Sequence, residues 1–111
     1  MSIRDIEIIE KIICYCDEIE EAKNRFGGAL EALQSDNLYK NAVSMSLLQI
    51  GELSAHLTDE FKSEYNKMPW QDIRGMRNIA VHHYGKFDVQ KLWETITNDI
   101  PMLSAYCKAL L

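Results

Sequence analysis

Apolar residues between Ile3 and Phe26 recur with the period of an α-helix, and this pattern restricts the chain to a narrow set of folds. They fall on two adjoining stripes at alternating spacings of three and four residues. An apolar face that wide contacts more than one neighbour, so we expect this helix inside a bundle, or between a bundle and a second subunit. The two stripes consist of Ile6, Ile9, Ile13 and Cys16, and of Ile8, Ile12, Tyr15, Ile19, Ala22 and Phe26.

The middle of the chain shows the same period in two further segments. Gly27 and Gly28 end the first helix, and a short helical turn is expected over Ala29–Leu33. Ser35, Asp36 and Asn37 are all suitable N-caps for a second long helix over Leu38–Glu64. Its predicted core stripe consists of Val43, Leu47, Ile50, Leu57 and Phe61.

A third helix is expected to begin at Pro69, because proline suits the first turn of a helix. Trp70, Ile73 and Met76 would face inward and support the segment that follows. Trp70 could instead stack an RNA base, although a single ring near the segment makes core packing the stronger interpretation.

The last helix is expected after Asp88, a possible cap, and its apolar phase continues through Pro101. The unbroken phase predicts one kinked helix or two nearly collinear ones. Its apolar positions are Val89, Leu92, Trp93, Ile96, Ile100, Leu103, Cys107 and Leu110.

No segment shows the alternation of a β-strand, and there is no internal repeat. A chain of 111 residues with 47% hydrophobic residues can bury one core without disulfides or metals. The sequence therefore predicts a single all-α domain over residues 1–111, an up-and-down bundle of four main helices whose last helix is kinked at a proline.

Composition favours a cytoplasmic protein. No apolar run approaches the roughly 20 residues of a membrane span, and the N-terminus has no basic region followed by an apolar one. Three cysteines suit a reducing compartment. Cys14 and Cys16 point to different sides of a helix, so we interpret them as small buried hydrophobes.

The segment Arg74–Gly85 carries the groups that act on phosphates. Arg77 offers a permanent charge and a planar fork of donors, His82 can transfer a proton near neutral pH, and Tyr84 adds a hydroxyl. Alternatively, the arginine and histidine only bond the last carbonyls of a helix, and the tyrosine only packs. Positions five apart lie about 140° around a helix axis, so the helix must end or distort between Ala80 and His82 if these groups act together.

Charge is unevenly distributed along the chain, whose net charge is −5. Residues 1–60 carry 12 acidic and 5 basic side chains, whereas residues 61–111 carry 5 acidic and 7 basic ones. The segment with Arg77 thus lies in the half that does not repel phosphate. A small basic surface patch could contact RNA there, with Arg74 and Lys86 as candidate contact residues. Alternatively, the cations are scattered solubilising groups. The flanking cations are Lys62, Lys67, Arg74, Lys86 and Lys91.

Two features of the second long helix bear on the site. Gly51 interrupts a sound helix at a cost of about 1 kcal/mol against alanine, which suggests close approach of another helix, such as the one bearing Arg77. Glu52 and His56 are four residues apart and could be half of a metal site, but an ordinary helix pair explains the spacing better. The sequence has no phosphate-binding glycine loop, Cys/His cluster or group of carboxylates, which argues against two-metal chemistry.

One short motif consists of Arg77 with Asn78 directly after it, His82 after four intervening residues, and Tyr84 after one more. This motif resembles the signature of the HepT-like toxins of the HEPN superfamily. The resemblance covers most of the chain. It takes in Asp36, Asn41-Ala42-Val43, Ile50-Gly51-Glu52, Pro69-Trp70, Ile73, Asp88, Trp93 and Asp99-Ile100-Pro101.

The resemblance implies a HEPN-like homodimer that acts as a metal-independent ribonuclease and needs no cofactor. It also implies a partner, a small nucleotidyltransferase antitoxin that silences the toxin by adding AMP to the motif tyrosine. Neither DNA nor a membrane is expected as a partner. By position, Arg77 and His82 are implied to be catalytic, Asn78 a polar helper and Tyr84 the modified residue. His83 is a second imidazole in the motif, and its role as an auxiliary proton carrier stays open.

A mechanism follows from these groups. We expect His82 to assist attack of a ribose 2′-hydroxyl on the adjacent phosphate while Arg77 stabilises the anionic transition state. One chain has a single motif histidine, whereas cleavage is best served by an acid and a base, so a two-fold dimer with both motifs in one cleft is expected. The main alternative is a binding module that holds a nucleotide or a nucleotidyltransferase without cleaving anything.

Overall fold

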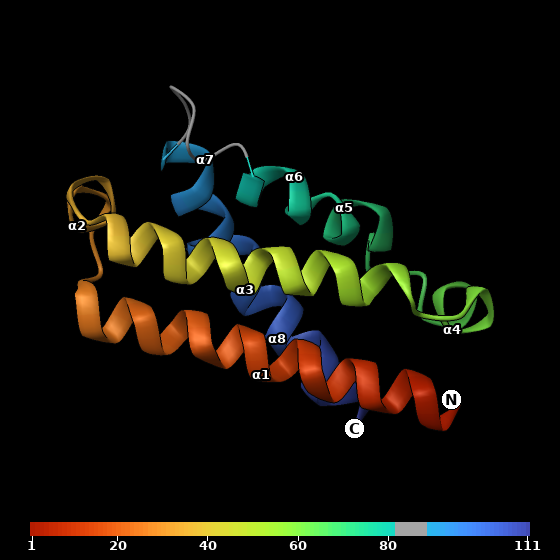
Figure 1. The fold of residues 1–111 in the computed structure, drawn as a ribbon. Helices are drawn as coiled ribbons and strands as arrows, with labels where there is room; N and C mark the ends of the chain where they lie inside the picture. The colour runs from red at the N-terminus through yellow and green to blue at the C-terminus, as the bar shows by residue number, and fades with distance from the viewer. Residues whose placement is uncertain (82–88) are drawn as a thin grey trace.

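The computed structural model describes residues 1–81 and 89–111, and every regular element within them is helical (Figure 1). Four main helical runs alternate in direction, formed by α1, by α3, by α5 with α6, and by α7 with α8 (Figure 1). The predicted all-α, up-and-down bundle is confirmed. The elements are α1 (Ile3–Phe26), α2 (Leu30–Ser35), α3 (Asn37–Ala55), α4 (Asp59–Glu64), α5 (Trp70–Arg74), α6 (Met76–Val81), α7 (Val89–Glu94), the π-helical turn η2 (Thr95–Asp99) and α8 (Ile100–Leu110).

The apolar face of the first helix, α1, contacts more than one neighbour, as its two stripes predicted. It packs against α3 on one side and α8 on another. Ser2 caps its N-terminus, accepting a hydrogen bond from the Asp5 amide at 3.0 Å. The buried positions of α1 are Asp5, Ile8, Ile9, Ile12, Cys16, Ile19 and Ala22.

The reversal from α1 to α3 is fixed by one glycine and one tyrosine. Gly27 has a φ of 124°, a backbone conformation that side-chain-bearing residues rarely adopt. The buried Tyr39 donates its hydroxyl hydrogen to the Gly27 carbonyl at 3.1 Å, and its ring stacks on Phe26 at 5.2 Å between centroids. Asp36, one of the three expected caps, accepts hydrogen bonds from the first amides of α3. The short turn expected before it is α2.

The expectation of one helix over Leu38–Glu64 is wrong, because the chain leaves helical conformation between α3 and α4. Thr58 caps α4, and its Oγ1 accepts a hydrogen bond from the Phe61 amide at 3.1 Å. The Thr58 amide and hydroxyl also donate to the Asp5 carboxylate, at 3.0 and 2.7 Å. These bonds to the start of α1 replace the bonds that a continuous helix would make. The predicted core stripe of this segment is nevertheless buried.

The third helical run is divided into α5 and α6 at Gly75. The Asn78 amide donates to the Gly75 carbonyl at 3.0 Å, a three-residue spacing that tightens the turn. Trp70, Ile73 and Met76 are buried, as predicted. The Trp70 indole donates to the Tyr65 carbonyl at 2.9 Å, and its ring lies among other core aromatics, so this tryptophan is a core residue.

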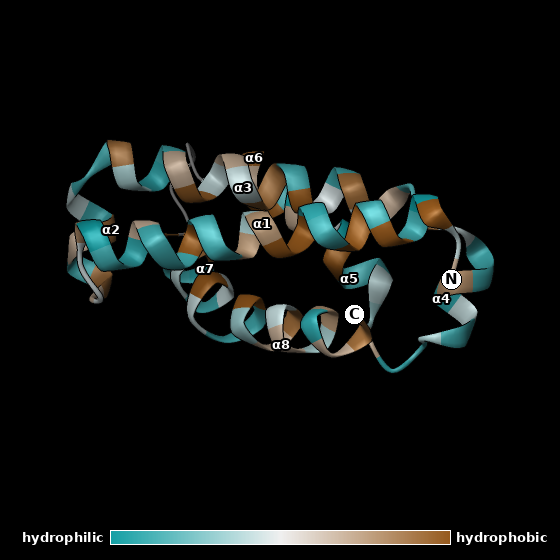
Figure 2. Ribbon diagram, turned by 90° about the horizontal axis from the view of Figure 1, so that it is seen from below, coloured by the Kyte–Doolittle hydropathy of each residue, from teal (hydrophilic) through white to brown (hydrophobic). Residues whose placement is uncertain are grey.

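The last run, from α7 through η2 to α8, continues in helical phase, as the apolar pattern predicted (Figure 2). The π-helical turn lies just before Pro101, which occupies the first turn of α8. Proline lacks an amide hydrogen and its ring clashes with the carbonyl four residues earlier, which accounts for the distortion there. The expected cap, Asp88, lies outside the described residues.

The cysteines only partly match their interpretation. Cys16 and Cys107 are buried, and burial raises the pKa of each thiol to about 12. Cys14 is exposed, contrary to the expectation that it is a buried hydrophobe, because it lies on the outer side of α1. Among the described helices, none is long and apolar enough to cross a membrane.

Candidate active site

Arg77 lies on α6, where its side chain forms an ion pair with Glu52 of α3. The Arg77 Nε and the Glu52 Oε1 are 2.6 Å apart, a short charge-assisted contact. Both side chains are about half exposed, at 57% and 49%. The pair therefore holds the guanidinium at the surface without removing it from solvent.

Gly51 sets the distance between α3 and the segment that carries Arg77. A Cβ atom built on Gly51 would lie 2.9 Å from the Arg74 carbonyl oxygen, 2.9 Å from the Arg77 amide nitrogen and 3.1 Å from the Arg77 Cβ. These contacts are shorter than real Cβ atoms tolerate, and two of them are with backbone. The close approach that Gly51 predicted is thus confirmed, and the approaching segment is the one bearing Arg77.

A polar cleft of about 690 Å³ opens where these segments meet, and we call it the arginine cleft. Among the described residues, its charged members are Arg74, Arg77 and Glu52, whose summed formal charge is positive although the whole chain is acidic. Asn78, the expected polar helper, also lines it. The lining residues are Gly51, Glu52, Ala55, Gln71, Arg74, Gly75, Arg77 and Asn78.

The arginine cleft suits an anionic ligand. Because the Arg77 Nε is engaged by Glu52, the two terminal guanidinium nitrogens remain for a second acceptor, and no ion pair within the described ranges occupies them. Arg74 adds a second cation one helical turn earlier in sequence. A phosphate with its two free oxygens matches a guanidinium fork in this arrangement.

Several predicted site residues lie outside the described part of the chain: His82, His83, Tyr84 and Lys86. The structure describes α6 as far as Val81, so the predicted end or distortion of the helix between Ala80 and His82 also falls partly outside it. What the structure establishes is that Arg74, Arg77 and Asn78 line one cleft.

The other expected cations do not gather with Arg77. Lys62 lies on α4 and Lys67 in the connection to α5, and neither lines the arginine cleft. Lys91 lies on α7 and lines a different depression. Arg74 is therefore the one flanking cation of the described residues that lines the cleft.

The four-residue spacing predicts that Glu52 pairs with His56 on one helix, with half of a metal site as the alternative. Instead it pairs with Arg77, which lies 25 positions later and on another helix. Within residues 1–81 and 89–111, no three His, Cys, Asp or Glu side chains are grouped to hold a metal ion. Gly51 is the one sequence signal for this pairing. Because another segment approaches Gly51 closely, the adjacent Glu52 must lie beside that segment.

Comparison of the sequence with known proteins finds a matching family and several relatives. Residues 12–110 match the family described as "HepT-like: Ribonuclease HepT-like". A protein named "Putative RNase" from Caldanaerobacter subterraneus subsp. tengcongensis is 33% identical over 103 residues, which cover 93% of this chain and 90% of that protein. "Probable ribonuclease HepT" from Thermococcus cleftensis is 33% identical over 101 residues, which cover 88% and 78%. A relative from Methanocaldococcus jannaschii with the same name as the first is 30% identical over 69 residues, which cover 62% and 63%. No solved structure matches the chain.

Proposed function

Since the chain belongs to the HepT-like ribonuclease family, we propose that it is the toxin of a toxin–antitoxin pair, a metal-independent endoribonuclease whose arginine cleft binds the phosphate to be cleaved. The observation that carries this proposal is the placement of Arg77: half exposed, held at 2.6 Å by Glu52, and beside Arg74 in a polar cleft of about 690 Å³. The positive cleft on an acidic protein attracts RNA locally.

The proposed reaction needs two proton transfers and one stabilised anion. His82 takes the proton of a ribose 2′-hydroxyl as that oxygen bonds to the adjacent phosphorus. The bond from phosphorus to the 5′-oxygen breaks, which leaves a 2′,3′-cyclic phosphate and a 5′-hydroxyl. Arg77 binds the phosphoryl oxygens as their negative charge grows. A second imidazole returns a proton to the leaving oxygen.

A homodimer supplies that second imidazole in our proposal. Each chain carries one motif histidine, His82, and two-fold symmetry brings two copies of the motif to one cleft. The neighbouring His83 is the alternative source within one chain, and adjacent residues usually point apart.

Glu52 has a positioning role in this scheme. It contacts Arg77 and carries the same charge sign as the substrate phosphate, so it does not bind that phosphate itself. Its carboxylate fixes the Nε edge of the guanidinium and leaves the terminal nitrogens directed at the ligand. Arg77 thus enters the reaction already oriented, which reduces the entropy lost on binding.

Regulation through Tyr84 completes the proposal. Adding AMP to its hydroxyl would place a negative phosphodiester near Arg77, where the substrate phosphate is expected to bind. The partner in this step is a nucleotidyltransferase antitoxin. Co-expression with a small nucleotidyltransferase of the antitoxin class, followed by mass spectrometry, should show AMP on Tyr84; full neutralisation with an unmodified tyrosine would contradict this part.

Cleavage of RNA in EDTA tests the enzymatic part. Wild-type protein should cleave, while His82→Ala and Arg77→Ala should each lose at least about a hundredfold in rate. Arg25→Ala is the matched control, because Arg25 is also an exposed arginine in an ion pair, 2.9 Å from Glu21 on α1, far from the cleft in sequence. Equal cleavage by all four proteins would point to a contaminating nuclease, and binding of RNA without cleavage would favour the binding module.

A further inference from the structure

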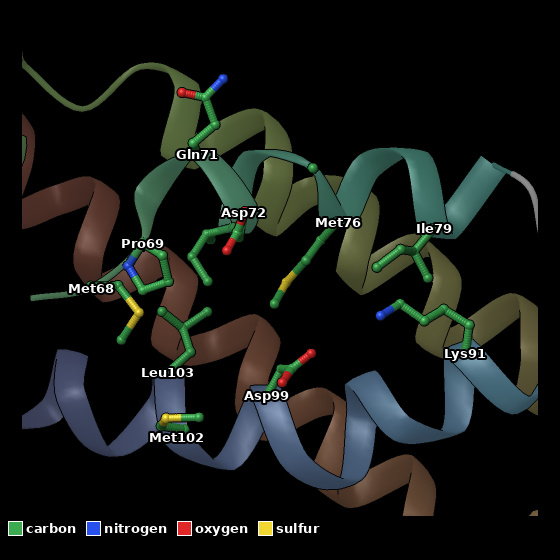
Figure 3. Close-up of a pocket in the computed structure, with 12 residues that line it drawn as sticks. Met68, Pro69, Gln71, Asp72, Met76, Ile79, Lys91, Asp99, Met102 and Leu103 are labelled. Carbon is green, nitrogen blue, oxygen red and sulfur yellow. The ribbon is translucent and has the colours of Figure 1, made fainter.

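A second depression lies on the side of α5–α6 that faces η2 and α8, and we call it the methionine groove (Figure 3). Its volume is about 380 Å³, within the range of pockets that accept a ligand or a large side chain. It shares Gln71 and Gly75 with the arginine cleft, so α5–α6 forms a wall of both. Nothing in the proposed ribonuclease reaction uses this groove.

The floor of the groove is apolar and adaptable. Met68, Ile73, Met76 and Leu103 are buried beneath it, and Met102 is 63% exposed at its edge. Methionine side chains are unbranched and polarizable, so they adjust to the shape of an incoming apolar group. A methionine as exposed as Met102 extends the apolar contact beyond the groove itself.

Two carboxylates stand over this apolar floor. The Asp72 and Asp99 side chains point into the space between the helices, and Lys91 reaches toward it from α7 (Figure 3). The Lys91 carbonyl accepts a hydrogen bond from the Thr95 hydroxyl, but none of the three charged side chains is in an ion pair or hydrogen bond with another described residue. The described residues that line the groove therefore combine an apolar floor with a formal charge of −1, opposite in sign to the charge of those that line the arginine cleft.

We propose that the methionine groove is a docking surface for a protein segment that presents an apolar side chain next to a lysine or arginine. The apolar side chain would occupy the floor, and the cation would pair with the carboxylates of Asp72 and Asp99, which form no ion pair with a residue that the structure describes. RNA does not fit this description, because its phosphates would face two carboxylates. This surface lies outside the proposed reaction and is independent of it.

Methionine methyl NMR gives a direct test, since three of the five methionines line the groove. The full chain is labelled at its methionine methyl carbons and titrated with a capped heptapeptide carrying a central leucine between two arginines. The methyl signals of Met68, Met76 and Met102 should shift and saturate. Met45, exposed on α3 outside the groove, is the internal reference and should not shift.

A matched peptide and a matched variant test the role of charge. Replacing both arginines of the peptide by glutamates should weaken binding about tenfold or more, since each exposed charge pair contributes up to about fivefold. In Asp72→Asn/Asp99→Asn that preference should disappear; both side chains are exposed, so the variant should fold, which its melting curve checks. Equal binding of both peptides to the wild type, no shift at the three groove methionines, or shifts that include Met45 equally would each overturn the proposal.

Discussion

The arginine cleft and the methionine groove share the α5–α6 segment as a wall, yet they are built in opposite ways. The cleft depends on close backbone approach: Gly51 lets α3 lie against Arg74 and Arg77, and charged side chains project from that contact. The groove depends on incomplete packing, with long methionine side chains around unfilled space between α5–α6 and α8. Geometry at the cleft is therefore rigid, which suits catalysis, whereas the groove can change shape around a partner.

Gly51→Ala should have the largest effect on the arginine cleft. Its new Cβ would meet two backbone atoms at 2.9 Å, so α3 and α6 must separate and Arg77 must move relative to Glu52. Overpacking of this kind costs about 1–3 kcal/mol, partly offset by the roughly 1 kcal/mol that alanine contributes in a helix. RNA cleavage should fall about a hundredfold, since a displacement near 1 Å has that effect on positioned groups.

A second glycine provides the control for that substitution. Nothing lies within 4 Å of a Cβ built on Gly28. Gly28→Ala should therefore leave both the equilibrium constant for unfolding in urea and the rate of RNA cleavage within about twofold of the wild type. If Gly51→Ala and Gly28→Ala behave alike, close approach does not shape the cleft.

Glu52→Gln should have the next largest effect, and it separates binding from orientation. The amide can still accept a hydrogen bond from Arg77, but the ion pair is lost. Removing a negative charge from the cleft should lower KM for RNA, while looser orientation of the guanidinium should lower kcat by about tenfold. Steady-state kinetics measure both constants. A kcat that stays within about twofold of the wild type would mean that Glu52 does not orient Arg77.

Asp5→Asn should reduce stability without touching either surface. Burial alone would raise the pKa of Asp5, but hydrogen bonds from Thr58 and Ser2 outweigh it and hold that pKa below its ordinary value of 3.8. The carboxylate therefore stabilises the fold fully above pH 3.8, and this contribution is lost as the pH falls through the lowered pKa of the folded state.

Urea unfolding between pH 2 and 7 measures this effect. Asp5→Asn should be less stable than the wild type by about 1–3 kcal/mol near neutral pH, and the difference should shrink in acid. RNA cleavage at low temperature should be unchanged. Stability curves that stay parallel over the whole pH range would show that the Asp5–Thr58 contact carries no net free energy.

Asp72→Asn/Asp99→Asn should also leave the rate of RNA cleavage within about twofold of the wild type, because both carboxylates lie on the groove side of α5–α6. Its consequence should be confined to peptide binding. A strong change in the cleavage rate would mean that the two surfaces are coupled through their common wall.

Local pattern predicted most of the helices. The stripes of α1, α3 and the last run repeat with the helical period, and burial by neighbouring helices follows from that period alone. Gly51 even indicated which contact it serves, since its helical cost required a compensating approach. The helical phase also survived Pro101, because a π-helical turn absorbs the proline without redirecting the chain.

Contacts between distant positions could not be predicted in this way. Thr58 starts a separate helix, α4, and Asp5, 53 residues away in sequence, holds it there by accepting its hydrogen bonds. Glu52 of α3 pairs with Arg77 of α6, whereas its four-residue spacing to His56 suggested a pair within one helix. Both contacts depend on which polar groups the packed helices bring together, and the period of the apolar residues contains no information about that.

Arginine side-chain NMR tests the central claim, that Arg77 binds the substrate phosphate from its ion pair with Glu52. Protein labelled with ¹⁵N-arginine is titrated with a 2′-O-methyl RNA oligonucleotide, which lacks the attacking hydroxyl. The Nε–H resonance of Arg77 should shift and saturate, while that of Arg25, ion-paired on α1, should stay in place. An Arg77 resonance that does not move while the oligonucleotide binds would contradict the account.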